Sequence, residues 1–425
     1  MLTKSLMKRS RPSASENNDK NVSCRRRVSD VTGDEVQFLL HTLSNIQQQL
    51  QLRLGTLPLL DLSPKRIGGK PRKHIAQHTS LIGHLKRFNL TKNKSMFIEF
   101  GSGVGRFSEQ LQEETDAMHF HLLIDRETFK PTRLRDTTMR RRATSNKHVP
   151  PDAVQRVTAD INDLNLVELI ETAYANVSND IEQDTTCSSS TCKETNTPST
   201  NKQNTMPIVA VSKHLCGEGF DMALSRLFEY HEAMSIRPTI CMTPCCHCLC
   251  TWEKFVNRSF FKVFGIGEKE FEAMSAVSQW ASLRFQEDVM LGEMEGVGKG
   301  TVGKVGKEGK AGKDGDGTDG TDGDGNARVL TADTLKLLTS CTKIDKAVDQ
   351  VDTMLILERQ QMLLAMSGKE LESELTRREK RQLGRCCKEC IDVARACGVL
   401  ENGYSQVVMF RYTQHSTENL LMVSI

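Results

Sequence analysis

The segment "SMFIEFGSGVGRF", residues 95–107, decides which fold this chain can adopt. It begins with an apolar run of strand length, passes through glycines at positions 101, 103 and 105, and ends in a helix-like segment from Arg106. A glycine turn of this kind lets a ligand lie against bare backbone at the N-terminus of a helix. The segment therefore predicts the first strand, a ligand-binding turn and the first crossover helix of an α/β domain.

Short apolar runs and helical patterns alternate along the rest of the chain. Strands are predicted at residues 95–100, 119–125, 155–160, 207–214 and 238–243, and helices at 106–115, 161–174 and 221–232. A helix over 369–397 precedes two further expected strands at 405–412 and 419–425. This order predicts a doubly wound α/β sheet with a C-terminal strand pair, in which the last strand runs antiparallel.

The 425 residues suit one large domain with insertions or two domains. Residues 1–33 are expected to be a disordered basic segment. Residues 34–90 are expected to be a helical extension, because apolar side chains recur at helical spacing over 34–54 and 75–90. We expect the main domain over 91–425, with flexible insertions at 184–206, rich in Ser, Thr and Asn, and at 292–326, rich in Gly.

Charge and cysteine usage limit the partners and the compartment. The net charge is only +3, but basic residues gather locally, as in "PKRIGGKPRKH" and "MRRRAT", which suits contacts with phosphates. The 14 cysteines are unevenly spaced, no apolar signal segment follows Met1, and no run approaches a membrane span. We expect free thiols in an intracellular compartment, nucleus or cytoplasm, with no membrane partner.

The glycine turn and nearby acids indicate the ligand. A dinucleotide fingerprint has Gly or Ala where this chain has Arg106, which counts against NAD. Glu99 precedes the turn directly, Asp125 ends the second strand and Asp160 ends the third. S-adenosylmethionine has no pyrophosphate and carries an ammonium group, so it suits this acidic edge. We expect a cofactor site formed by Glu99, Gly101, Gly103, Gly105, Asp125 and Asp160.

Five islands make a family resemblance specific. "VSKHLCGEGFDMAL" (211–224) resembles the KHLCG-x-x-x-D-x-AL signature of a eukaryotic tRNA methyltransferase family, the tRNA:m4X modification enzymes, and "CCHCLCTW" (245–252) resembles its CCHHRC-x-W. Three further stretches are similar to it: "HTSLIGHL" (78–85), "FFKVFGIGEKEFEAMSAVSQWA" (260–281) and "GYSQVVMFRYTQHSTENLLMV" (403–423). The resemblance implies a Rossmann-like class I S-adenosylmethionine-dependent methyltransferase. It also implies tRNA, not DNA, as the substrate, methylated at the ribose 2′-oxygen of acceptor-stem nucleotide 4.

The chain departs from this family at several points. Family members carry small Cys/His zinc modules near the N-terminus, whereas residues 1–70 contain one cysteine, Cys24, and one histidine, His41. Cys248 stands where the family has a second histidine, and Gly219-Phe220 replace the usual Ala-Thr. Two alternatives therefore stay open: a methyltransferase acting on another substrate, and a non-catalytic tRNA-binding relative.

Methyl transfer to a ribose requires that a poorly nucleophilic hydroxyl be oriented and relieved of its proton. Lys213 and His214 end the fourth strand, which faces the cofactor in this fold, and we expect them to be the catalytic residues. For RNA binding the prediction is the basic stretch Arg140, Arg141 and Arg142, because a duplex stem is recognised through its shape and phosphates.

The stretch "TPCCHCLCTW" (243–252) crowds cysteines around His247. Cys245, Cys248 and Cys250 with His247 offer metal ligands, and a fourth would come from elsewhere, such as Cys216 or Cys241. Their spacing lacks the two separated knuckles of a usual zinc module, so the sequence favours no metal. We expect instead a loop at the substrate opening, with His247 contacting the RNA.

Overall fold

The computed structural model describes residues 26–50, 54, 57–63, 73–115, 119–145, 153–183, 206–283, 362–414, 416 and 418–424. The expected insertion at 292–326 lies outside the described residues, as does all but the last residue of 184–206. Of the N-terminal segment predicted to be disordered, residues 1–25 are also outside, while Val28–Asp30 form a short 3-10 helix.

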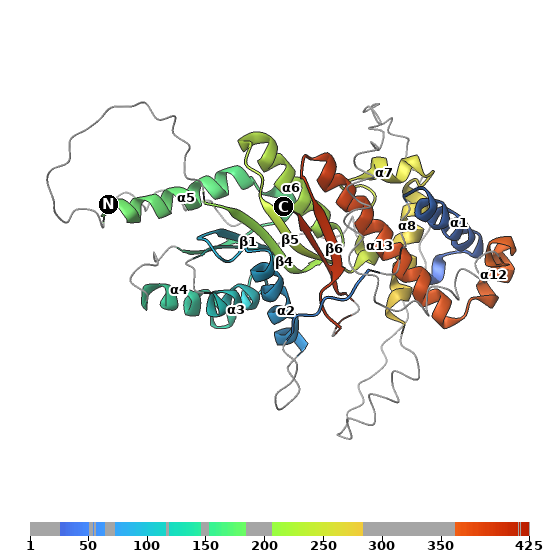
Figure 1. Cartoon of the computed structure of the whole chain (residues 1–425), viewed down its shortest axis with the longest axis horizontal. Coiled ribbons are helices and arrows are strands. Elements are labelled where there is room, and N and C mark those ends of the chain that lie inside the picture. Colours follow the sequence, from blue (N-terminus) through green and yellow to red (C-terminus); the bar gives the residue numbers. More distant parts are fainter. Residues whose placement is uncertain are drawn as a thin grey trace, which may run out of the picture.

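Seven strands form one sheet (Figure 1). They are β1 (Met96–Phe100), β2 (Phe120–Asp125), β3 (Val154–Thr158), β4 (Ile208–Cys216), β5 (Thr239–Cys245), β6 (Val407–Arg411) and β7 (Leu420–Ser424). The order across the sheet is β3-β2-β1-β4-β5-β7-β6, and β7 runs antiparallel to both of its neighbours. The predicted α/β sheet, its C-terminal strand pair and the antiparallel last strand are therefore confirmed.

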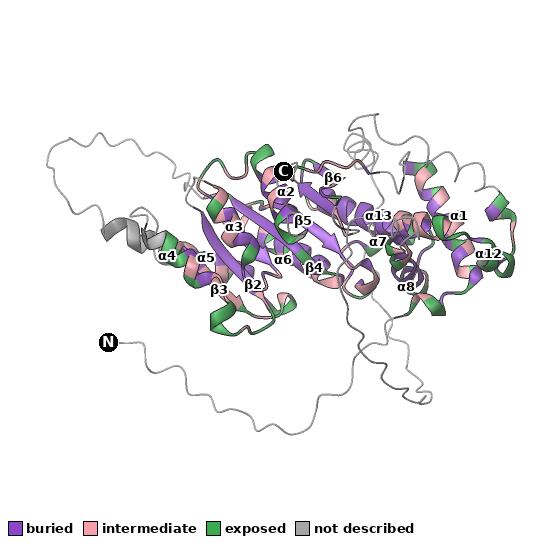
Figure 2. Ribbon diagram, turned by 90° about the horizontal axis from the view of Figure 1, so that it is seen from below, coloured by how far each residue is buried: buried purple, intermediate pink, exposed green. Residues whose placement is uncertain are grey.

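Helices cover both faces of this sheet. On one face α2 (Lys73–Arg87) and α3 (Arg106–Glu114) pack on strand residues such as Phe97 and Val209. On the other, α5 (Leu166–Gln183) and α6 (Glu218–Met234) pack on residues such as Ile98 and Ala210. A further helix, α4 (Asp136–Ser145), packs beside β3 through Met139. Because helices cover both faces, the central strand β1 is buried along its whole length and the neighbouring β4 along most of its length (Figure 2).

A group of helices lies beyond the β6 edge of the sheet (Figure 1). It contains α1 (Gly33–Leu50), α7 (Arg258–Val263), α8 (Glu268–Val277), α12 (Gly368–Glu374) and α13 (Arg377–Glu401). The predicted apolar stripe of α1 is buried in the same core as the sheet, at Val36, Leu39, Leu43, Ile46 and Leu50. The α1 helix therefore packs on the main body of the protein.

The helix predicted over 369–397 is two helices, α12 and α13. The chain turns at Leu375 and Thr376, whose hydroxyl accepts from the Glu379 N–H while the Glu379 carboxylate accepts from Thr376. This capping box gives α13 its own N-terminus. Its cysteines Cys390 and Cys397 are fully buried and belong to the core. Within the described residues, no helix has the length and apolar character needed to span a membrane.

Candidate functional site

The glycine loop lies where the strand order reverses, between β1 and β4. Gly101, Gly103 and Gly105 have φ angles of 66°, 53° and 83°, a region that favours glycine. A Cβ on Gly101 would lie 2.9 Å from the His214 carbonyl oxygen, whereas a Cβ on Gly103 would meet nothing within 4 Å. Ligands of open α/β sheets bind at such a switch point, so Gly103 lines an open cradle at the expected place.

The predicted acids lie at the same edge of the sheet. The Asp125 carboxylate accepts hydrogen bonds from the Gly103 N–H at 2.7 Å and the Glu127 N–H at 2.8 Å. Asp125 remains partly exposed, so its oxygens keep lone pairs for a ligand. Asp160 is exposed beyond the end of β3, where its side chain accepts from the Asn162 N–H at 2.9 Å. Asp125 thus contacts the loop directly, and Asp160 follows the end of the neighbouring strand β3.

Glu99 differs from these two because it is buried. Its carboxyl accepts from the Ser108 hydroxyl at 2.5 Å, which joins the end of β1 to α3. Burial raises the pKa of Glu99 to about 7, against the opposing effect of the Ser108 hydrogen bonds. We infer that Glu99 positions the glycine loop through this hydrogen bond to α3.

Arg156 is a loop-positioning residue that the sequence analysis missed. Its guanidinium forms a bidentate ion pair with Asp136, at 2.7 and 2.8 Å. The same group donates to the Gly103 carbonyl at 2.8 Å and to the Ser102 hydroxyl at 3.2 Å. An arginine inside the predicted strand "QRVTAD" was the available signal, because a charge in a covered strand requires a partner.

Lys213 and His214 occupy a bulge in β4. The register with β5 shifts between Ser212 and Leu215, so β4 holds one extra residue there. The Thr243 hydroxyl lies 2.6 Å from the Lys213 carbonyl and holds the bulge. Lys213 is buried, whereas His214 is exposed. Since Gly101 faces the His214 backbone, the predicted catalytic pair lies next to the glycine loop.

Two histidines of α2 complete this basic cluster. The Lys213 Nζ lies 3.0 Å from Nδ1 of His74, whose ring meets that of His214 edge-on at 6.3 Å. One turn along the helix, burial and then the Lys213 charge lower the pKa of His78 to about 3, so that ring is neutral. His74 was not selected from the sequence as a site residue, because it precedes the first family island, which begins at His78.

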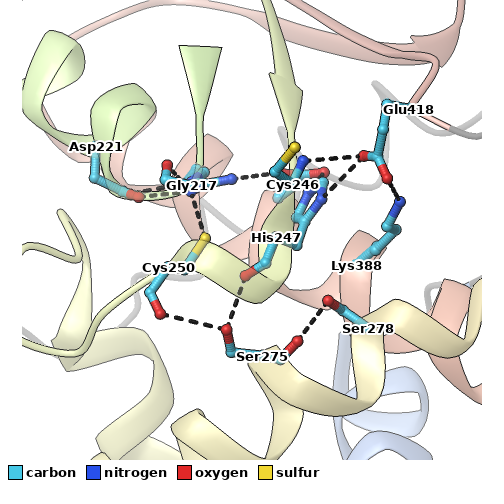
Figure 3. Close-up of polar contacts among 11 residues, drawn as sticks. Gly217, Asp221, Cys246, His247, Cys250, Ser275, Ser278, Lys388 and Glu418 are labelled. Atoms are coloured by element: carbon cyan, nitrogen blue, oxygen red, sulfur yellow. Dashed lines mark hydrogen bonds and ion pairs between the residues drawn. The ribbon is translucent and has the colours of Figure 1, made fainter. Parts of the chain in front are cut away.

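A buried ionic network lies near Gly217, which directly follows β4 (Figure 3). Arg395 of α13 is fully buried and donates to both Asp221 oxygens at 3.1 and 2.5 Å and to Asp392 at 2.9 Å. It also reaches the Gly217 carbonyl at 3.3 Å and the Cys250 sulfur at 3.1 Å. Arg395 therefore connects α13 to α6 and to the loops after β4 and β5.

His247 extends this network. It is 1% exposed, and its Nε2 lies 2.7 Å from Asp392, with Nδ1 3.7 Å from Glu418. Burial opposes protonation, but the Asp392 and Glu418 carboxylates outweigh it and raise the pKa of His247. Contacts with His247 and Lys388 lower the pKa of Glu418 to about 2 despite burial. Because the ring is buried between these two carboxylates, the geometry favours a structural role for His247 over the direct RNA contact expected for it.

The three arginines predicted to bind RNA lie along α4 and are all exposed. Arg140 donates through Nε to the Val154 carbonyl at 3.1 Å, and Arg142 pairs with Glu113 of α3. The helix thus presents basic side chains beside the β3 edge, and Arg140 and Arg142 also contact protein groups.

The cysteines that lie together are not the set of metal ligands considered from the sequence. The sulfurs of Cys216, Cys245 and Cys246 lie within 4.8 Å of one another. Cys250 instead contacts Arg395, and His247 is engaged by Asp392. Cys241 is buried in the core under α2.

The glycine loop at the switch point, the strand-end carboxylates and the adjoining basic cluster make this edge of the sheet the candidate cofactor site of a doubly wound α/β protein. Residues 76–425 match the model of one family, Methyltransferase TRM13. The chain belongs to this family.

Curated relatives support the assignment. The chain is 26% identical over 217 residues to a Dictyostelium discoideum protein named tRNA:m(4)X modification enzyme TRM13 homolog, which covers 50% of the chain and 34% of the relative. A mouse homolog of the same name is 24% identical over 265 residues, 52% of the chain and 46% of the relative. A Vanderwaltozyma polyspora enzyme, tRNA:m(4)X modification enzyme TRM13, is 26% identical over 272 residues, 59% and 54% respectively. The matched region thus spans from a third to about half of these relatives.

Proposed function

We propose that this chain is a Rossmann-like class I methyltransferase that uses S-adenosylmethionine to methylate the ribose 2′-oxygen of nucleotide 4 in the tRNA acceptor stem. The observation that carries the proposal is the adjacency of the glycine loop and the Lys213–His214 bulge, joined where Gly101 lies against His214. The family match and the relatives' names support it. A tRNA substrate agrees with an intracellular location, nucleus or cytoplasm.

The residues at the loop fit this cofactor. Open space beside the Gly103 backbone supports a nucleoside lying against the loop, and Asp125 and Asp160 at the strand ends would accept from its hydroxyl and amino groups. The bound cofactor supplies an activated methyl group on a sulfonium. Glu99 and Arg156 keep the loop in place, from the α3 side and from β3 respectively.

The basic cluster then provides the help that a ribose hydroxyl requires. Lys213 and His74 share a hydrogen bond, so a protonated lysine donates to Nδ1 of the imidazole. An ammonium held in this partly enclosed site lowers the pKa of a nearby hydroxyl, and His214, exposed beside it, is available to orient the hydroxyl or accept its proton.

Single-turnover methylation of tRNA at saturating concentrations tests this assignment. Lys213→Ala and His214→Ala are expected to reduce the rate by roughly 100-fold or more, the usual contribution of acid–base residues. Affinity for S-adenosylhomocysteine, measured by calorimetry, should stay within about threefold, because neither side chain holds the cofactor. Lys92→Ala, on the opposite edge of the sheet before β1, serves as the control. Near-normal rates in both variants would exclude the catalytic pair, and absent cofactor binding by the intact chain would exclude the enzyme.

The proposed binding of tRNA by α4 can be tested separately. Replacing Arg140, Arg141 and Arg142 by Gln should weaken tRNA binding and reduce the slope of log affinity against log salt by about one per lost phosphate contact. An unchanged slope would place the RNA elsewhere on the chain.

A further inference from the structure

Three thiols meet at the carboxyl ends of β4 and β5, and neither the cofactor site nor the basic cluster uses them. Cys216 and Cys245 are register partners in the sheet, with their sulfurs 3.5 Å apart. Cys246 brings a third sulfur, and all three lie within 4.8 Å of one another. Cys216 is exposed, so the group opens to solvent on one side.

The backbone is bent to bring the third sulfur in. Successive residues of a strand point to opposite faces, so Cys245 and Cys246 would ordinarily hold their thiols apart. Cys246 has φ 49° and ψ 50°, a left-handed conformation that costs free energy for a residue with a Cβ. Such a conformation persists where the surroundings impose it, and these sites are often functional.

Specific contacts impose it here. The Cys246 N–H donates to the Glu418 carboxylate at 3.2 Å, and Glu418 is itself held by Lys388 (Figure 3). On the other side, the Gly217 N–H donates to the Cys245 carbonyl at 3.0 Å. The thiol group is therefore fixed by hydrogen bonds outside it, as the ligands of metal sites usually are.

We propose that Cys216, Cys245 and Cys246 bind a thiophilic cation, Zn²⁺, as three thiolate ligands. Tetrahedral zinc with Zn–S bonds of about 2.3 Å separates its sulfurs by about 3.8 Å. The Cys216 and Cys245 sulfurs are 3.5 Å apart, and all three sulfurs lie within 4.8 Å of one another. A fourth position faces the open side at Cys216, where water completes the coordination. Soft thiolates prefer Zn²⁺ or Cu⁺ to harder cations.

Such an ion ties together two strand ends that carry the proposed chemistry. Cys216 lies three residues after Lys213 on β4, and Cys246 directly precedes His247. The metal would therefore hold the bulge of β4 against β5, a positioning role separate from methyl transfer itself.

Metal analysis of the full chain, purified under reducing conditions, tests the site. We expect about one zinc per chain, and Co²⁺ substitution should give the near-ultraviolet absorption of thiolate-to-metal charge transfer. Cys216→Ser, chosen because Cys216 is exposed, should weaken zinc binding by more than the roughly 10- to 100-fold typical of residues around a ligand shell. Far-ultraviolet circular dichroism checks that this variant folds.

Cys248→Ser is the matched control, because Cys248 lies in the same loop, is partly buried and stands outside the group. It should retain the zinc and the charge-transfer band. Two outcomes overturn the site: no thiolate absorption on adding Co²⁺ to the reduced chain, or equal zinc content in the Cys216 and Cys248 variants. These readouts do not depend on methyl transfer, so their failure leaves the proposed enzyme untouched.

Discussion

Gly101 and Gly103 are two residues apart in one turn, yet their surroundings differ. Both have left-handed φ angles, so an alanine costs about 1 kcal/mol of strain at either position. At Gly101 the added methyl also meets the His214 carbonyl at 2.9 Å, while at Gly103 it enters open space. We therefore expect Gly103→Ala to fold with only the strain penalty but to bind S-adenosylhomocysteine at least about tenfold more weakly, because its methyl fills the cradle.

Gly101→Ala should lose a further 1–3 kcal/mol or so, the usual cost of overpacking. Urea denaturation and calorimetry on both variants check the pair. Normal cofactor affinity in Gly103→Ala would mean that the nucleoside does not lie against this face of the loop.

His121 makes the stability of the fold depend on pH. It is buried in β2 with both ring nitrogens unpartnered among the described residues, and burial lowers its pKa from 6.5 to about 3. Above pH 6.5 the ring is neutral in both states. As the pH falls from 6.5 toward 3, only the unfolded chain gains the proton, so stability is lost in that window.

His121→Leu removes this loss, which amounts to about 3 kcal/mol by pH 4. The stability of the variant relative to the wild type should therefore rise as the pH falls, measured by urea denaturation between pH 7 and pH 4. His41→Gln, at an exposed position of α1, should follow the wild type throughout. A constant difference between His121→Leu and the wild type would show that His121 does not titrate in this way.

Some site residues can be predicted from a short stretch of sequence, and others cannot. Gly101, Gly103 and Asp125 were predicted because glycine spacing and strand-end acids are visible within a few residues. Asp392 and Arg395 were missed, since charges three residues apart on a helix normally lie on a solvated face. Their full burial depends on partners more than 140 residues away in sequence, at His247 and Asp221.

Strand β4 contains a β-bulge that its sequence pattern did not predict. Its apolar run predicted a regular strand over 207–214, but a bulge interrupts it where Lys213 and His214 lie. The bulge depends on the Thr243 hydroxyl, which contacts the Ser212 and Lys213 carbonyls at 3.1 and 2.6 Å. Such a contact comes from the neighbouring strand, so the sequence of β4 alone does not encode it.

Thr243→Val keeps the shape of the side chain and deletes this hydroxyl. We expect a loss of about 1–2 kcal/mol in the free energy of unfolding, because buried carbonyl groups lose a donor. Since the bulge orients the proposed catalytic pair, the single-turnover rate should fall by about tenfold or more while cofactor affinity stays within about threefold. Thr251→Val, whose hydroxyl bonds Glu218 at 2.9 Å outside the bulge, is the comparison. Equal rates in the two variants would separate the bulge from catalysis.

Across the whole molecule, the family islands converge although they are far apart in the chain. Asp221 from the first signature, His247 from the second and Glu418 from the C-terminal island join one buried network through α13. The stretches that carry the family resemblance thus also contribute residues to one buried network. The network joins the helix group beyond β6 to the loops at the sheet edge.

Arg395 is the centre of that network, so its removal is the most severe change that we predict. Arg395→Met leaves Asp221 and Asp392 buried without their shared partner, which should cost about 3–5 kcal/mol of unfolding free energy. Combining it with Asp221→Asn removes one buried charge that has lost its partner. The double variant should therefore lose less unfolding free energy than the sum of the two single losses, by about 1–3 kcal/mol. Glu229→Ala breaks the exposed Arg226–Glu229 pair of α6 and should cost no more than about 1 kcal/mol. Urea denaturation of the four variants gives the coupling, and strictly additive losses would show that Arg395 and Asp221 do not act as a pair.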